Sequence, residues 1–250
     1  MKITVVTPSI RKEGLPVVAQ ALSNQEFKDF EWLVGSPFTP NLDVDNIPLF
    51  KWVEDKFGGG FWSLNRIYNK MFKKARGELV VTLQDWIWIP PDGLQKFVDA
   101  MESINNEGIV SGVGDKYEKP GPYGKPEIKI WNDPRKTIEH GTFYQCYAHD
   151  AEWNWCVFPK KYIFDIGGMD EKLDFLGYGG DQLQVDERWD AMGYKTYLDQ
   201  ANECFAIDHT RSDFGGQEEW DKKHVFLNGI YNARKEELMR SGRWPVLKFL

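Results

Sequence analysis

Short apolar runs alternate with helical stripes along the first half of the chain. Residues 3–7, 31–34 and 79–83 are largely apolar over the length of a buried strand. Residues 62–75 and 94–104 instead place apolar side chains three and four positions apart, which predicts helices with one buried face. Strands that alternate with helices predict an α/β fold with a central, mostly parallel sheet flanked by helices. The stripe of the first helix consists of Leu64, Ile67, Tyr68, Met71, Phe72 and Ala75.

The pattern changes in the second half of the chain. Between residues 112 and 158, Gly, Pro, aromatic and charged residues follow each other without a period, which predicts loops and short strands. A helix is predicted to begin at Asp181, because apolar residues recur after it at roughly helical spacing and Gly193 is placed to end it. Spaced apolar positions in the charged segment 213–250 predict one or two further helices. No Pro-, Gly- or Ser-rich linker divides the chain, so we predict a single domain.

Composition narrows the classes of partner and compartment. The formal net charge of −7 argues against nucleic acid as the main partner, because phosphate binding normally requires a basic surface. The three cysteines form no dense framework, which indicates a reducing compartment. The amino-terminal apolar run is too short for a signal peptide, and no stretch of about 18 apolar residues occurs. We therefore expect a cytoplasmic protein without a transmembrane segment. The tail after Arg243 suits either a packed terminus or contact with a membrane surface.

Two acidic positions carry the candidate chemistry. The glycine pairs 167–168 and 179–180 flank an acidic loop and give its backbone the freedom to turn sharply. Asp181 follows this loop, where it serves either as the N-cap of its helix or as a functional carboxylate. Asp85 follows the strand 79–83, and ligands of open α/β sheets bind beyond the carboxyl ends of strands. Asp85 is therefore either a binding residue or a turn residue that ends the strand.

The two segments around these acids resemble the nucleotide-sugar glycosyltransferases of the GT-A fold, family 2 type. In that family the second segment reads like GGFDE, then GYGGED, then a helix that bears an Arg, then GY. This chain has GGMDE at 167–171, GYGGDQ at 177–182, Arg188 in the predicted helix, and Gly193 with Tyr194. The likeness spans residues 2–209, and its carboxyl-half motif is the more specific part. It implies a single GT-A domain with a Rossmann-like nucleotide-binding half at 1–112, an acceptor and catalytic half at 113–212, and a helical segment at 213–250.

The resemblance also implies roles for individual residues. Asp181 corresponds to the acid thought to act as the base that deprotonates the acceptor, whereas the second acid of that pair is Gln182 here. Residues 35–37, Gly-Ser-Pro, replace the aspartates that read the base, so base recognition must differ. Trp155 lies in the region that lines the bound sugars in the family, where it forms either a sugar platform or part of the core. The residues implied to contact the nucleotide sugar are Thr7, Pro8, Ser9, Arg11, Asn69, Gln84, Asp85 and Trp155.

The metal site departs furthest from the family pattern. The family's DxD motif grips Mg²⁺ or Mn²⁺, which bridges the diphosphate oxygens, and this chain has Gln84-Asp85-Trp86 in its place. The resemblance implies Asp85 and His209 as metal ligands, with Mn²⁺ suiting a mixed oxygen and imidazole site better than Mg²⁺. Metal-independent transfer remains an alternative. A zinc site built from Cys146, His149 and Cys156 with Cys204 or His209 is a second alternative, although its spacing fits no standard pattern.

The function expected from the resemblance is inverting sugar transfer from a nucleoside diphosphate sugar, with a UDP-sugar favoured, to a hydroxyl of a glycan acceptor. Asp181 would take the acceptor proton, and a divalent metal would sit at the diphosphate. Two alternatives stay open. The missing acids at Gln84 and Gln182 suit a catalytically silent module that binds nucleotide sugar or glycan. The basic turn with Arg11 and Lys12 gives weak support to nucleotidyl transfer on a similar fold.

Overall fold

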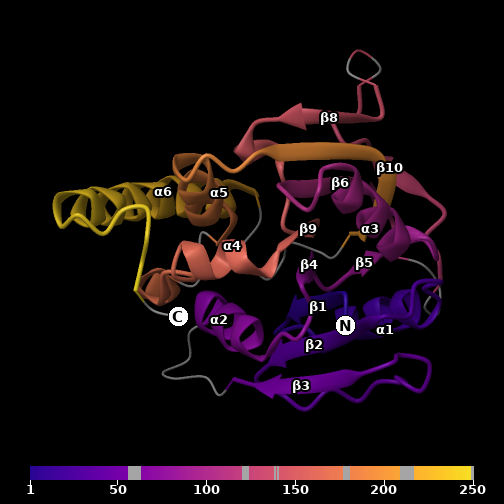
Figure 1. Ribbon diagram of the computed structural model, residues 1–250. Helices are drawn as coiled ribbons and strands as arrows, with labels where there is room; N and C mark the ends of the chain where they lie inside the picture. The colour runs from indigo at the N-terminus through magenta and orange to yellow at the C-terminus, as the bar shows by residue number, and fades with distance from the viewer. Residues whose placement is uncertain are drawn as a thin grey trace.

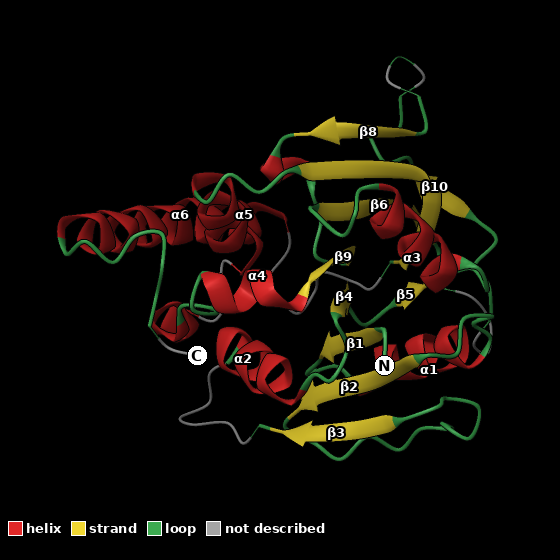
Figure 2. Cartoon of the chain, viewed as in Figure 1, coloured by secondary structure: helices red, strands yellow, loops and turns green. Residues whose placement is uncertain are grey.

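A mixed β-sheet runs through the molecule, and helices lie on both of its faces (Figures 1 and 2). The computed structural model describes residues 1–55, 63–119, 124–137, 139, 141–176, 181–208 and 217–248. The strands in these ranges are β1 (Ile3–Pro8), β2 (Phe30–Ser36), β3 (Phe50–Glu54), β4 (Leu79–Leu83), β5 (Ile87–Trp88), β6 (Ile109–Tyr117), β7 (Lys129–Trp131), β8 (Phe143–Cys146), β9 (Trp155–Pro159) and β10 (Thr196–Ile207).

The α-helices are α1 (Leu15–Ser23), α2 (Leu64–Lys74), α3 (Gly93–Ser103), α4 (Lys160–Asp165), α5 (Asp181–Ala191) and α6 (Gln217–Arg240). The short 3₁₀ helices are η1 (Lys12–Gly14), η2 (Ala148–Asp150) and η3 (Glu171–Leu176). The predicted helices over 62–75 and 94–104 and the predicted strand over 79–83 are confirmed by α2, α3 and β4. Among the described residues, no helix combines the length and the apolar character needed to cross a membrane.

The order of the strands creates a switch point at the centre of the sheet. The main path runs β3-β2-β1-β4-β9-β6-β10-β5, with β7 beside β6 and β8 beside β10. Strands β1 to β4 are parallel, and β9 runs antiparallel to both β4 and β6. The chain moves from β1 outward to β2 and β3, then returns to place β4 on the other side of β1. Ligands of such sheets bind beyond the carboxyl ends of the two strands between which the order reverses, here β1 and β4.

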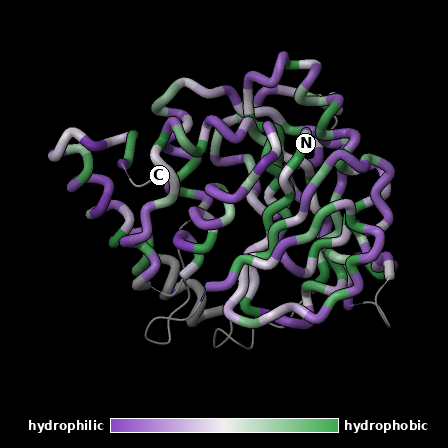
Figure 3. The backbone as a smooth tube through the Cα atoms, turned by 60° about the horizontal axis from the view of Figure 1, so that its bottom comes forward, coloured by the Kyte–Doolittle hydropathy of each residue, from purple (hydrophilic) through white to green (hydrophobic). Residues whose placement is uncertain are grey.

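Two apolar layers cover the sheet. One layer packs α1 and α3 against the strands, and the other packs α2, α4 and α5 against the opposite face. Figure 3 shows the apolar segments gathered along the interior strands, with more polar segments in the outer turns and helices. The sheet is thereby held rigidly between the layers, and its carboxyl edge offers fixed positions for polar side chains.

Candidate active site

A polar cluster joins the ends of β1 and β4 at the switch point. Ser9 Oγ donates a hydrogen bond to Asp85 Oδ2 at 2.6 Å. Arg11 donates from Nε to the same carboxylate oxygen at 3.0 Å, and its Nη2 contacts the other oxygen of Asp85. Ser9 and Asp85 are buried, whereas the Arg11 side chain keeps 27% of its surface exposed. A buried carboxylate therefore lies at this edge with a partly exposed guanidinium over it.

The residue after Asp85 fixes the backbone of this cluster. Trp86 has a φ of 62°, a left-handed conformation that is uncommon for a bulky aromatic residue. Its ring lies so close to Gly14 that a Cβ atom there would be 2.7 Å from it. Lys119 Nζ lies 4.7 Å from the centre of the same ring. Strained backbone persists where the surroundings impose it and is concentrated at functional sites, which supports a binding role for Asp85.

A second acid, Asp55, lies at the same edge and was missed in the sequence. It follows β3 and accepts hydrogen bonds from Arg66 Nε and Nη2, both at 3.0 Å, and from Lys70 Nζ at 2.5 Å. Together with Ser9 and Ser36 it lines a small cavity beyond the ends of β1, β2 and β3. The only sequence signal was an acid after a short apolar run, because β3 itself was not predicted.

The remaining residues predicted at β1 and β4 are less available to a ligand. Thr7 is fully buried, and its Oγ1 accepts a hydrogen bond from Trp32 Nε1 at 2.9 Å. Pro8 ends β1 and is also buried. Gln84 is half-buried, and its backbone N–H donates to Asn154 O at 3.2 Å. The structure thus brings Ser9, Arg11 and Asp85 together, with Gln84 next to them, whereas Thr7 faces the core.

Asn69 positions a turn, and its predicted contact with the nucleotide stays a prediction. Its Nδ2 donates to Met169 O at 3.0 Å and to Glu171 Oε1 at 2.9 Å. Its Oδ1 accepts the backbone N–H of Met169 at 2.8 Å. The side chain is 2% exposed, and these bonds tie α2 to the turn 167–171.

Trp155 lies in the core, which agrees with the second of the two roles predicted for it. The residue is fully buried, and its ring centre lies 4.3 Å from that of Phe97. Trp153 is buried on the opposite face, 5.2 Å from the ring of Tyr68. Both rings therefore stabilise the apolar layers and leave no face for a sugar.

Arg188, a buried residue of α5, stabilises the turn 167–171 through hydrogen bonds to its backbone. Arg188 donates to Ile166 O at 3.0 Å, to Gly168 O at 2.7 Å and to Gln184 O at 2.9 Å. Burial lowers the pKa of its guanidinium to about 10, because the charged form loses water. Gly167 has a φ of +76°, and a Cβ atom there would lie 1.3 Å from Leu247 O, so only glycine fits. The family-like GG motif and Arg188 thus serve to shape the loop before α5.

Replacing Arg188 with Met is expected to lower the free energy of unfolding by about 2–4 kcal/mol, because buried carbonyl groups would lose their donors. Urea denaturation followed by circular dichroism measures the change. Arg240→Met is the matched control, since the Arg240 side chain is 73% exposed and its loss should cost less than about 0.5 kcal/mol. Equal losses in the two variants would contradict the proposed role of Arg188.

Asp174 links the same acidic segment to the start of α2. Its two carboxylate oxygens accept the backbone N–H groups of Asn65 at 2.8 Å and Arg66 at 3.0 Å. Burial raises the pKa of Asp174 to about 6, and the two backbone donors oppose this shift only in part. The carboxyl group thus caps the amino terminus of α2 and titrates close to neutral pH.

A raised carboxyl pKa in the folded state predicts a defined pH dependence of stability. The folded protein binds the Asp174 proton more tightly than the unfolded chain, so the contribution is complete below pH about 4 and is lost as pH rises through about 6. Asp174→Asn removes this titration. The difference in unfolding free energy between wild type and variant should therefore change by about 2–3 kcal/mol between these pH values. Parallel pH profiles from urea denaturation would contradict the assignment.

The predicted base lies at the start of α5. The helix begins at Asp181, as predicted, while the side chain of this residue lies outside the described part of the chain. Gln182 is half-buried, and its Nε2 donates to Ala151 O, next to η2. His209, the predicted second metal ligand, also lies outside the described residues.

The cysteines do not form the alternative zinc site. None of the three forms a disulfide, and Cys156 and Cys204 are buried in different apolar layers. In the ranges that the structure describes, no three His, Cys, Asp or Glu side chains are grouped as metal ligands. Of the residues predicted at a metal site, the described part of the chain includes Asp85 and the neighbouring Gln84.

Comparison with solved structures identifies the fold. TarS residues 1–349 from S. aureus, in complex with UDP, align with a TM-score of 0.58 at 13% identity over 91% of this chain and 64% of that one. The mannosyltransferase PcManGT from Pyrobaculum calidifontis, in complex with GDP-Man and Mn²⁺, aligns with a TM-score of 0.59 at 15% identity over 89% of this chain and 60% of that one. GalNAc-T7 with UDP, GalNAc and Mn²⁺ gives 0.60 at 10% identity over 84% and 44% of the two chains.

These likenesses show that the chain has the GT-A fold of nucleotide-sugar glycosyltransferases, which confirms the predicted fold class. The chain spans less than two thirds of the length of each of these structures. No family model matches the sequence, and no curated protein matches it either.

Proposed function

We propose that this protein is an inverting glycosyltransferase that moves a sugar from a nucleoside diphosphate sugar to a hydroxyl of a glycan acceptor. The observation that carries the proposal is the Ser9, Arg11 and Asp85 cluster at the switch point between β1 and β4. The fold neighbours support it, because TarS is solved with UDP and UDP-GlcNAc, and PcManGT with GDP-Man. We favour a UDP-sugar as donor. The three cysteines, none of which is in a disulfide, suit a cytoplasmic location.

The cluster offers a positive charge for a diphosphate and a carboxylate that holds this charge in place. The guanidinium of Arg11 is planar and partly exposed, so it suits the oxygens of a diphosphate. Asp85 holds it in place through both carboxylate oxygens. The small cavity next to Ser9 is lined by residues 35–37 and by Asp55, so these residues lie at the same edge of the sheet as the cluster.

Asp85 and Gln84 supply oxygen atoms, which are the ligands that a divalent metal prefers. The Arg11 guanidinium contacts both oxygens of Asp85, so a bound ion would have to displace part of this contact. We propose that these residues, with His209, hold Mn²⁺ or Mg²⁺. When bound, the ion would offset the negative charge that develops on the departing diphosphate. Two fold neighbours are solved with Mn²⁺.

Arg11 should compete with the metal for Asp85. Arg11→Gln is expected to tighten the binding of Mn²⁺ alone by about 10-fold, because a cation is removed from the carboxylate. The same variant should bind UDP more weakly in the absence of metal. Isothermal calorimetry measures both affinities, and Arg66→Gln, which disturbs Asp55 instead, is the control. Unchanged Mn²⁺ affinity in Arg11→Gln would contradict a metal site at Asp85.

Asp181 is the proposed base. A carboxylate at the first residue of a helix is stabilised in its charged form by the free N–H groups of the first turn, so it remains ready to accept a proton at neutral pH. Direct attack by the acceptor hydroxyl on the anomeric carbon, with loss of the nucleoside diphosphate, inverts that centre. The proton of the hydroxyl passes to Asp181.

A catalytically silent binding module is the second candidate, because Arg11 and Ser9 occupy the only acid of the Gln84-Asp85-Trp86 motif. One experiment separates the two: hydrolysis and transfer with a panel of UDP, GDP and dTDP sugars, with Mn²⁺ and with EDTA. Turnover of one donor supports the transferase and identifies the donor. Nucleotide-sugar binding by calorimetry without turnover, in the presence of glycan acceptors, would support the silent module.

A further inference from the structure

A groove of about 1050 Å³ lies between β8, η2, the end of α5 and the start of β10, apart from the cluster of Ser9, Arg11 and Asp85. Figure 1 shows β8 and β10 at one side of the molecule, separated from β1 and β4 by the strands between them. The volume lies at the upper end of the range for ligand pockets. None of the residues predicted to bind nucleotide or metal lines it. The groove is therefore a feature that the donor site does not explain.

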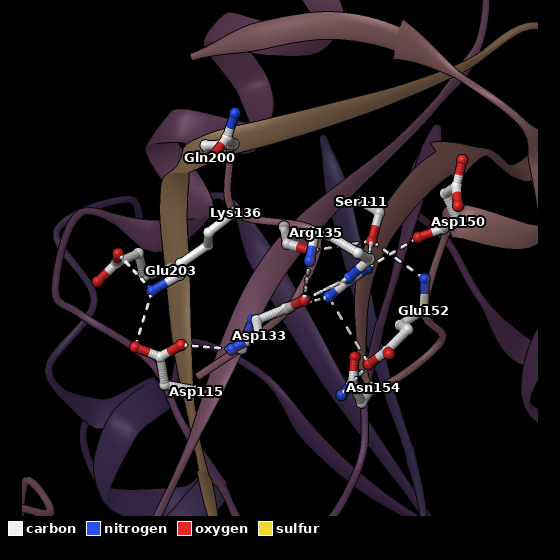
Figure 4. Close-up of polar contacts among 12 residues, drawn as sticks. Ser111, Asp115, Asp133, Arg135, Lys136, Asp150, Glu152, Asn154, Gln200 and Glu203 are labelled. Carbon is white, nitrogen blue, oxygen red and sulfur yellow. Dashed lines mark hydrogen bonds and ion pairs between the residues drawn. The ribbon is translucent and has the colours of Figure 1, made fainter. Parts of the chain in front are cut away.

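The charged side chains that line the groove have no net charge. Arg135 and Lys195 supply two positive charges, and Asp150 and Asp190 supply two negative ones. Arg135 is largely committed, because it donates to both oxygens of Asp133 and to the backbone oxygen of Asp150 at 2.8 Å (Figure 4). A phosphorylated or sulfated ligand would need a surplus of positive charge, which this groove lacks. Its chemistry suits an uncharged polar ligand.

Aromatic side chains with polar tips line the groove beside these charges. Tyr147 is 75% exposed, and its ring lies parallel to that of His149 with centres 5.4 Å apart. Tyr144 is held by a hydrogen bond from its hydroxyl to Arg135 O at 3.3 Å. Tyrosine presents an apolar ring face and a hydroxyl that both donates and accepts. Sugar rings offer the matching surfaces, with C–H groups on their faces and hydroxyls at their edges.

The groove is connected to the proposed base through η2 and α5. Asp150 lines the groove at the end of η2, and the next residue, Ala151, accepts the hydrogen bond from Gln182 at the start of α5. Asp190 lines the groove near the other end of α5, about 13 Å from Asp181 along the helix axis. The end of the groove at Asp150 is therefore the end nearest to the amino terminus of α5.

We propose that this groove binds the distal sugars of an extended, uncharged oligosaccharide acceptor. The binding itself stands on the groove alone. The statement that the reacting end of the oligosaccharide reaches Asp181 rests on the proposed function. The inference adds to that function the class of acceptor, which is a neutral glycan of several sugar units. It also adds the groove as the place where longer acceptors make additional contacts.

The test measures oligosaccharide binding in the absence of donor. Calorimetry or saturation-transfer NMR is performed with neutral chito-, malto- and galacto-oligosaccharides of increasing length. We expect affinity to rise with length for one series. Tyr147→Ala and Asp190→Ala should each weaken it by about 10-fold, without altering the thermal melt. Phe143→Ala is the matched control, since Phe143 lies on the same strand as Tyr144 but stacks on Tyr197 outside the groove.

Two results would overturn the inference. One is a failure of every neutral series to bind, and the other is equal affinity in wild type and Tyr147→Ala. Tighter binding of a sulfated oligosaccharide of matched length would also contradict the neutral class. The experiment distinguishes failure of the proposed glycan binding from failure of the proposed function. Glycan binding without sugar transfer would leave the groove standing, whereas transfer to acceptors whose KM is unaffected by Tyr147→Ala would leave only the transferase.

Discussion

Replacing Asp85 with Asn is expected to lower kcat/KM for sugar transfer by about 100-fold or more. The side chain keeps its size but loses the charge that holds the Arg11 guanidinium and that would bind a divalent ion. Electrostatic groups aimed at charge that develops in a transition state are commonly worth 100- to 1000-fold when one is removed. Initial rates with the donor identified by the nucleotide-sugar panel measure the loss. Calorimetry should show in parallel that Mn²⁺ binding is weakened.

Asp92→Asn is the matched control for this prediction. Asp92 lies seven residues further along the chain, and its side chain is 45% exposed in an ion pair with Lys96, away from the switch point. Its loss should leave kcat/KM unchanged within about twofold. A similar thermal melt for both variants would exclude a general effect on folding. Wild-type activity in Asp85→Asn would remove the cluster from the mechanism.

The cluster of Ser9, Arg11 and Asp85 was largely predictable from the sequence, because these residues follow two strands with a clear apolar pattern. The apolar runs 3–7 and 79–83 placed Ser9, Arg11 and Asp85 just beyond two neighbouring parallel strands. The pairing of Arg11 with Asp85 was not predictable, since 74 residues separate them and their contact depends on the register of β1 and β4. Asp55 was missed because β3 is short and only half-buried, which leaves a weak pattern.

The family-like positions in both halves of the chain were recognised as a pattern, but two of them position other residues. Asn69 and Arg188 were read as family matches, and both are buried residues that shape the turn 167–171. Spacing alone does not distinguish a residue that contacts a bound molecule from a residue that supports the loop around it. Trp155 illustrates the same limit, because a tryptophan next to a candidate site looks identical in sequence whether its ring faces a sugar or a core.

Replacing Asp181 with Asn is expected to lower kcat for transfer by about 1000-fold while leaving the KM for the donor within about threefold. General base catalysis typically contributes 100- to 10,000-fold, and the amide cannot accept the proton of the acceptor hydroxyl. Asn is also a good N-cap, so the start of α5 should be preserved and the free energy of unfolding should be nearly unchanged. A role confined to capping therefore predicts no loss of activity at all.

The conservative variant Asp181→Glu and the pH profile of kcat test directly whether Asp181 is the base. Asp181→Glu returns a carboxylate one methylene further along and should recover part of kcat, whereas Asp99→Asn, a change of an exposed acid on α3, should have no effect. In wild type, kcat should fall on the acidic side as Asp181 is protonated, and this limb should disappear in Asp181→Asn. An unchanged acidic limb in that variant would assign the base to another residue. Loss of donor binding in place of kcat would instead place Asp181 at the nucleotide sugar, where its charge would act on the donor and not on the acceptor hydroxyl.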